Sequence, residues 1–83
     1  MSYNTRISLR GLDESTRQKV LEACRYCEKK DKYKSFIYKL SKDGNTITII
    51  SPTREIAYKR GNFFKKRFHV FFNIIRESKT NSL

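Results

Sequence analysis

The sequence predicts an α+β fold, with an antiparallel sheet of three to four strands and two helices on one face, in the order β-α-β-β-(β)-α. Three observations predict it. Apolar and polar residues alternate near the N-terminus, helical spacing follows in residues 13–29, and an Asp-Gly pair divides two β-rich runs in residues 35–51. The 83 residues fit one domain. We assign this domain to residues 1–78 and expect a frayed tail at 79–83.

The first predicted strand covers residues 3–10 and ends at Gly11. The side chains of one face are Tyr3, Thr5, Ile7 and Leu9, and those of the other are Asn4, Arg6, Ser8 and Arg10. This period of two is typical of a strand with one buried face.

A helix is predicted over residues 13–29. Asp13 is a good N-cap, because its carboxylate can accept hydrogen bonds from the unpaired amides of the first turn. Val20, Leu21, Cys24 and Cys27 then form an apolar stripe at helical spacing.

The strongest local signal is a hairpin around Asp43-Gly44. Asp-Gly favours the left-handed backbone of a tight hairpin turn. That turn places Leu40 opposite Ile47 and Tyr38 opposite Ile49. The predicted inner face carries Phe36, Tyr38, Leu40, Ile47 and Ile49.

The last third of the chain is less regular. Residues 55–60 alternate in a way that favours a third hairpin strand, although Ser51 and Pro52 could instead be the N-cap and first residue of a helix. From Phe63 to Glu77 the spacing of the apolar residues is helical. The predicted stripe of this last helix is Phe64, Phe68, Phe71 and Ile75.

Positive charge dominates the composition, with 19 Lys and Arg against 8 Asp and Glu and a formal net charge of +11. Self-repulsion on this scale disfavours the compact state, so we expect an anionic partner, and nucleic acid is the first candidate. The sequence has neither an apolar run long enough for a membrane span nor the apolar stretch of a signal peptide. We therefore expect a cytoplasmic protein that does not bind membranes.

A triplet of cations, Lys65-Lys66-Arg67, lies where the last helix is predicted to begin. Cations at that end oppose the helix dipole, and bound phosphates would remove the penalty. A solvated surface is the alternative interpretation. The candidate nucleic-acid contacts, mainly to phosphates, are Lys59, Arg60, Lys65, Lys66 and Arg67 near this helix and Arg6, Arg10 and Lys39 on the sheet.

With this basic cluster, residues 13–77 resemble the double-stranded-RNA-binding domain in their predicted α-β-β-β-α order. Members of that family carry a Lys-Lys motif at the start of the last helix, which contacts phosphates across a major groove. Lys65 and Lys66 occupy the matching positions, with Gly61 before them and Arg67 after. The sequence departs from the family in its Phe-rich last helix and its short first hairpin loop. The resemblance implies a preference for RNA over DNA.

Two features could indicate redox, metal or catalytic chemistry: the Cys24-x-x-Cys27 spacing and a single histidine. Cys24 and Cys27 continue the apolar stripe of their helix, so we expect buried, free thiols rather than a redox or metal site. His69 is the only histidine. We expect no cofactor, no metal and no enzymatic activity, with a small ribonuclease using His69 as the lesser alternative.

A second hypothesis is a small accessory or inhibitor protein that binds an acidic protein. In its compact, basic, Lys-, Ile-, Asn- and Phe-rich style the chain resembles the short early proteins of large lytic phages. That resemblance implies an antitoxin-like role against a host toxin or nuclease, in the host cytoplasm. A homodimer through Phe63 or Phe72 is a further expectation, because the last predicted helix is more apolar than one sheet face requires.

Overall fold

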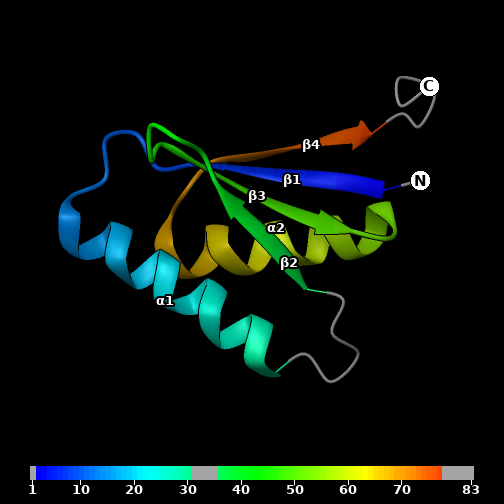
Figure 1. Ribbon diagram of the computed structural model, residues 1–83, viewed down its shortest axis with the longest axis horizontal. Coiled ribbons are helices and arrows are strands. Elements are labelled where there is room, and N and C mark those ends of the chain that lie inside the picture. Colours follow the sequence, from blue (N-terminus) through cyan, green and yellow to red (C-terminus); the bar gives the residue numbers. More distant parts are fainter. Residues whose placement is uncertain (1, 31–35, 78–83) are drawn as a thin grey trace.

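A computed structural model describes residues 2–30 and 36–77 and confirms the predicted fold class (Figure 1). The predicted tail at 79–83 lies outside these residues. The elements, in chain order, are β1 (Ser2–Ser8), α1 (Glu14–Lys30), β2 (Ile37–Leu40), β3 (Thr46–Ser51), α2 (Arg54–Phe68) and β4 (Phe72–Glu77).

The four strands form one antiparallel sheet in the order β2-β3-β1-β4. Because β3 lies between β1 and β2, which α1 connects, the β-α-β-β-α-β chain has the split β-α-β, or ferredoxin-like, arrangement. Both helices lie on one face of the sheet (Figure 1). The other face carries no helix among the described residues, and β2 and β4 are the edge strands.

The core lies between the sheet and the two helices. Its fully buried side chains include Ile7, Ile47 and Ile49 from the sheet, Val20 and Cys24 from α1, and Phe64 from α2. A buried hydrogen bond also joins α2 to the central strand, since the Thr5 hydroxyl donates to the carbonyl of Ala57 at 2.9 Å. Neither described helix is long and apolar enough to cross a membrane.

The first half of the chain follows the predictions closely. In α1 the Thr16 amide donates to the Asp13 carboxylate at 2.8 Å, which is the expected N-cap. In the hairpin, Leu40 lies opposite Ile47 and Tyr38 opposite Ile49, as the Asp-Gly turn requires. The left-handed backbone expected in the turn is found at Gly44, whose φ is 75°, but not at Asp43, and the Gly44 amide donates instead to the Ser41 carbonyl at 3.0 Å.

The strand predicted at residues 55–60 is wrong, because these residues belong to α2. The alternative, a helix beginning near Ser51 and Pro52, gives the correct secondary structure but the wrong first residues. The N-cap is Thr53, whose hydroxyl accepts a hydrogen bond from the Ile56 amide at 3.2 Å. Helical spacing of the buried residues Ala57, Gly61 and Phe64 decides the outcome, because it lets α2 bury one face against the sheet.

The helix predicted over 63–77 is also wrong in its second half, since α2 ends at Phe68 and residues 72–77 form β4. His69 closes the helix in the left-handed conformation, with φ 58°, and its amide donates to the carbonyl of Lys65 at 2.8 Å. Residues 14–77 therefore follow the order α-β-β-α-β, whereas the resemblance to the double-stranded-RNA-binding domain was based on α-β-β-β-α.

Candidate nucleic-acid interface

The cationic triplet Lys65-Lys66-Arg67 lies in the last turn of α2, not in the first turn of a helix. Cations at a helix C-terminus are stabilised by the dipole rather than penalised. The predicted local penalty is therefore wrong, and any phosphate binding by these residues must be argued from their surroundings.

Arg60 is committed to the fold. Its guanidinium donates to the Ser51 hydroxyl at 2.9 Å and to the Ile50 carbonyl at 3.3 Å, and it lies 4.9 Å from the centre of the Phe36 ring. A half-buried arginine with these contacts holds α2 against β3. Lys59, the preceding residue, is exposed on α2.

Arg6 and Lys39 lie on the open face of the sheet. The register places Lys39, Thr48, Arg6 and Asn73 in one row across all four strands. This row is polar, and the described residues of the central strands place no aromatic side chain on this face, so a base has no ring to stack on here. Arg10, just beyond β1, is exposed as well.

Arg10 lies near the hairpin turn, where Asp43 provides a local counter-charge. The pKa of Asp43 is lowered first by its hydrogen bond from the Ser41 hydroxyl, then by one from the Asn45 amide, and to a smaller extent by the Arg10 charge.

A more concentrated basic surface lies between α2 and β4. Three neighbouring hollows, with volumes of about 320, 410 and 330 Å³, lie along the two elements. The first and second hollows share Lys65 and Phe71, and the first and third share Arg54 and Ile74. We call these three hollows together the α2–β4 groove. Its polar and aromatic lining residues are Tyr3, Arg54, Tyr58, Asn62, Lys65, Lys66, His69, Phe71, Phe72, Asn73 and Arg76.

Helical spacing explains which residues of α2 reach the groove. Arg54, Tyr58, Asn62, Lys65 and His69 follow one another at intervals of three or four residues, so they lie along one side of the helix. The Arg54 guanidinium lies 5.5 Å from the centre of the Tyr58 ring. This side of α2 therefore presents cations and an aromatic ring next to one another.

The floor of the groove depends on Gly61. A Cβ at this position would lie 2.5 Å from Cδ2 and 2.8 Å from Cζ of Phe72, so only glycine lets the Phe72 ring pack this closely on α2. The edge of that ring in turn meets Tyr58, with 6.2 Å between ring centres and an interplanar angle of 81°. Contact with Phe72 on α2's inner side thus helps to position the Tyr58 ring, which is 45% exposed.

The groove is uniformly positive. Its lining includes the cations Arg54, Lys65 and Lys66, with Arg76 at one end, and none of the described lining residues is acidic. A hollow lined by one sign of charge concentrates the field and attracts counter-ions. Two of its rings are also exposed: Phe71 by 80% and Tyr58 by 45%.

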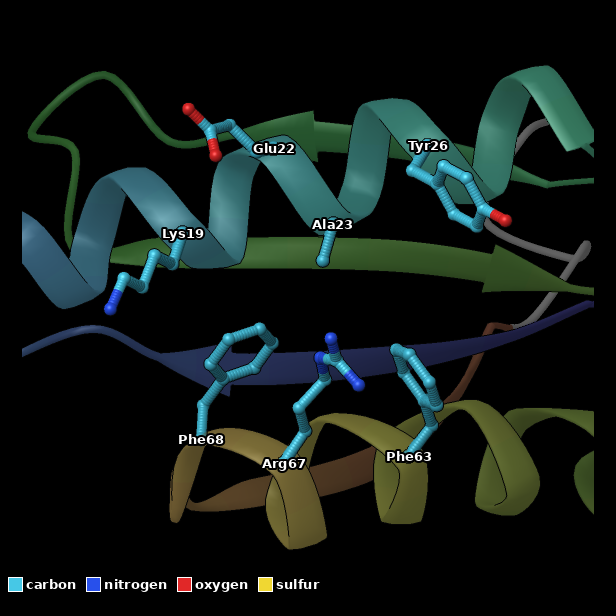
Figure 2. A pocket seen from close by; sticks show the side chains of 7 residues that line it. All are labelled: Lys19, Glu22, Ala23, Tyr26, Phe63, Arg67 and Phe68. Carbon is cyan, nitrogen blue, oxygen red and sulfur yellow. The ribbon is translucent and has the colours of Figure 1, made fainter.

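A second groove separates α1 from α2 and has a volume of about 520 Å³. Figure 2 shows Arg67 extending from α2 toward α1 between the rings of Phe63 and Phe68, with Tyr26 on the opposite wall. The Arg67 guanidinium lies 6.0 Å from the Phe63 ring centre and 5.9 Å from that of Phe68. We call this hollow the α1–α2 groove. Unlike the first, it contains an acidic side chain, Glu22.

The other candidate chemistry receives no geometric support. Cys24 and Cys27 are free thiols. Burial, with smaller contributions from Cys27 and Glu28, raises the pKa of Cys24 to about 12, and burial also raises the pKa of Cys27, so both disfavour the reactive thiolate. No cluster of His, Cys, Asp and Glu suited to a metal ion occurs within residues 2–30 and 36–77.

Comparison with protein families and with curated proteins finds no match. The candidate site therefore depends on geometry. Of the residues predicted to bind nucleic acid, only Lys65 and Lys66 line the α2–β4 groove, and the others lie elsewhere. Sequence reasoning missed Arg54, Tyr58 and Phe71. Recognition of Thr53 as an N-cap would have aligned Arg54, Tyr58 and Lys65 on one helix side.

Proposed function

We propose that the protein is a small, non-enzymatic nucleic-acid-binding protein that contacts phosphates along the α2–β4 groove, with RNA as the favoured ligand. The observation that carries the proposal is the gathering of Arg54, Lys65, Lys66 and Arg76 in one groove whose described lining includes no acid. Such a groove can follow the backbone of a nucleic acid, because each cation releases condensed counter-ions when it meets a phosphate.

Aromatic side chains in the groove favour RNA. Exposed rings beside cations suit unpaired bases, which RNA presents in its loops, bulges and ends. The row formed by Lys39, Thr48, Arg6 and Asn73 on the sheet is a weaker candidate, because it offers two cations and no ring. Binding to RNA would be consistent with a cytoplasmic location, in the host if the protein is phage-encoded.

The salt dependence of binding tests the proposal. Phosphate contacts by Arg54, Lys65 and Lys66 predict that log K falls linearly with log[salt] with a slope of about −2 to −3. Arg54→Gln and Lys65→Gln should each reduce the magnitude of this slope by about 0.7 to 0.9. Lys42→Gln, an exposed site in the hairpin turn, removes the same charge and should leave the slope unchanged. Affinity that stays constant between 50 and about 200 mM salt would refute phosphate binding.

A ribonuclease would need more than the groove provides. His69 lines the second hollow beside Lys65 and Lys66, but no described carboxylate lines the groove to act as its acid–base partner. We therefore expect RNA to remain intact during long incubation with the protein. Cleavage by the wild type that disappears in His69→Ala would replace this proposal with an enzymatic function.

The α1–α2 groove supports a second candidate, an accessory protein that binds an acidic protein. Tyr26 and Phe63 are 62% and 43% exposed there, and Arg67 contacts no carboxylate among the described residues. Exposed aromatic rings around a cation can receive an apolar side chain next to an acidic one. This arrangement is consistent with the antitoxin-like hypothesis.

Nuclease treatment separates the two candidates. A partner bound through the α1–α2 groove should remain after nuclease digestion, have an acidic surface and be lost in Phe63→Ser. A partner held only through nucleic acid should disappear on digestion. Homodimerisation through Phe63 stays a prediction, and sedimentation equilibrium of the wild type and Phe63→Ser measures it directly.

A further inference from the structure

We infer that the α2–β4 groove takes single-stranded rather than double-stranded nucleic acid, with one unpaired base stacked on Phe71 and a neighbouring base on the Arg54–Tyr58 pair. This inference rests on the proposed function and names the form of its ligand. It follows from where the exposed rings lie relative to the cations.

Phe71 is the first element of the argument. With 80% of its surface exposed, it is the most exposed large hydrophobic side chain among the described residues, and it lies where the first and second hollows meet. The left-handed backbone at His69 turns the chain directly after α2, and Phe71 follows two residues later, just before β4. Lys65 lines the same two hollows, so one ligand could contact both the Lys65 ammonium group and the exposed Phe71 ring.

The Arg54–Tyr58 pair provides a second stacking platform. Phe72 supports the inner side of Tyr58, while the Arg54 guanidinium lies 5.5 Å from the ring centre. Guanidinium planes and aromatic rings both stack on bases. Phe71 and this pair line one hollow together, which gives successive bases two platforms along the groove.

The third step concerns hydrogen bonding. β4 pairs only with β1 in the described sheet, so alternate residues of β4 direct backbone N–H and C=O groups toward the free edge beside the groove. Asn62 of α2 lines the groove as well. These groups can bind the edges of unpaired bases, whose donors and acceptors are not occupied by a complementary strand.

A duplex would use little of this arrangement. Its bases are already stacked on one another and paired, so it offers Phe71 and Tyr58 no open base face. Only its phosphates would meet Arg54 and Lys65. Rings and cations together are the combination that single-stranded nucleic-acid sites use, where phosphates follow a positive groove and bases stack on aromatic residues.

Fluorescence anisotropy with one labelled RNA in two forms tests the inference. The probe is an unstructured 12-nucleotide RNA, free or annealed to its complement, measured at 50 mM salt. We expect tighter binding of the free strand. Phe71→Ala should weaken that binding by about 5- to 150-fold, the range found for loss of one stacked base. Phe71→Trp, which keeps a ring, should restore it, and the salt slope should be the same in all three proteins.

Phe63→Ala is the matched control. Phe63 is an exposed phenylalanine of α2, but it lines the α1–α2 groove, so its removal should leave the affinity for RNA unchanged. Far-UV circular dichroism checks that each variant is folded. Duplex binding as tight as single-strand binding, with Phe71→Ala equal to the wild type, would overturn the single-strand inference and leave phosphate binding intact. Binding of neither form would overturn the proposed function itself.

Discussion

Gly61→Ala should destabilise the wild-type protein but stabilise a variant that lacks the Phe72 ring. Gly61 is buried in the middle of α2, and a Cβ there would approach three atoms of the Phe72 ring, at 2.5 Å from Cδ2, at 2.8 Å from Cζ and closer still to Cε2. Real Cβ atoms do not tolerate such contacts, so the ring must move. The substitution therefore tests the packing that forms the floor of the α2–β4 groove.

Two opposing terms set the expected magnitude. Alanine is favoured over glycine by about 1 kcal/mol in a helix interior. Overpacking of a well-filled contact costs about 1–3 kcal/mol. In the wild type the free energy of unfolding should therefore fall by up to about 2 kcal/mol. Each kcal/mol lost lowers the Tm by about 4–8 °C in a domain of this size. In Phe72→Ala the clash is absent, and Gly61→Ala should gain about 1 kcal/mol.

Urea unfolding followed by circular dichroism, on the wild type, both single variants and the double variant, measures the coupling directly. The reversal of sign is the diagnostic result, because helix propensity alone predicts stabilisation in both backgrounds. If Gly61→Ala changes the free energy of unfolding equally in the two backgrounds, the close contact between α2 and Phe72 is refuted. In the wild-type background the displaced ring should also weaken binding in the groove.

Two further outcomes test the core. Thr5→Val should cost about 0.5–1.5 kcal/mol, because it removes the hydrogen bond that the hydroxyl donates to the Ala57 carbonyl. Thr5→Ser keeps the hydroxyl and should cost less, and chemical denaturation measures the free energy of unfolding of both variants. The wild type should lose stability relative to Cys24→Ala above about pH 9, by at most about 1.4 kcal/mol per pH unit. In the folded protein the raised pKa keeps the Cys24 thiol protonated to about pH 12, whereas in the unfolded chain the thiol loses its proton near pH 9. Urea unfolding at pH 8 and 10.5 measures this, and a constant difference would contradict it.

Local signals were sufficient for the first 51 residues. The alternation that ends at Leu9, the cap at Asp13 and the Asp43-Gly44 turn each depend on neighbours a few residues away. They fixed β1, α1 and the hairpin register without knowledge of the rest of the fold. β1, α1 and β3 bury residues of the face that their own period defines, so local preference and tertiary packing agree there, whereas Leu40 at the end of β2 is 46% exposed although it was predicted on the inner face.

The C-terminal third was mispredicted because its apolar pattern satisfies two periods. Phe64, Phe68, Phe71 and Ile75 have helical spacing, yet Phe72 and Ile74 are half-buried while Asn73 and Ile75 are exposed, which is the alternation of a strand. The chain changes direction at His69, and because non-glycine residues seldom take the left-handed conformation, a single histidine did not predict the end of the helix. Pairing with β1 decides between the two periods, and no local rule could supply that pairing.

The candidate site was predicted only where charge was dense in the sequence. Lys65 and Lys66 were identified, although for an incorrect reason. Arg54 and Phe71 were missed, because they become neighbours only when β4 folds back beside α2. A site assembled from a helix and a distant strand has no sequence motif of its own.

The triplet Lys65-Lys66-Arg67 is divided between two grooves, so the net charge of the protein does not by itself locate a binding surface. Successive residues of a helix are separated by about 100°, so residues 65 and 67 lie on nearly opposite sides of α2. Lys65 faces β4 and lines a groove with other cations, while Arg67 extends toward α1 between two phenylalanine rings. Three consecutive cations therefore do not form one phosphate-binding surface. Removal of one unit charge at residue 65 and at residue 67 therefore affects different surfaces. The net charge of +11 predicts an anionic ligand where the fold gathers cations and no described lining residue is acidic, as in the α2–β4 groove.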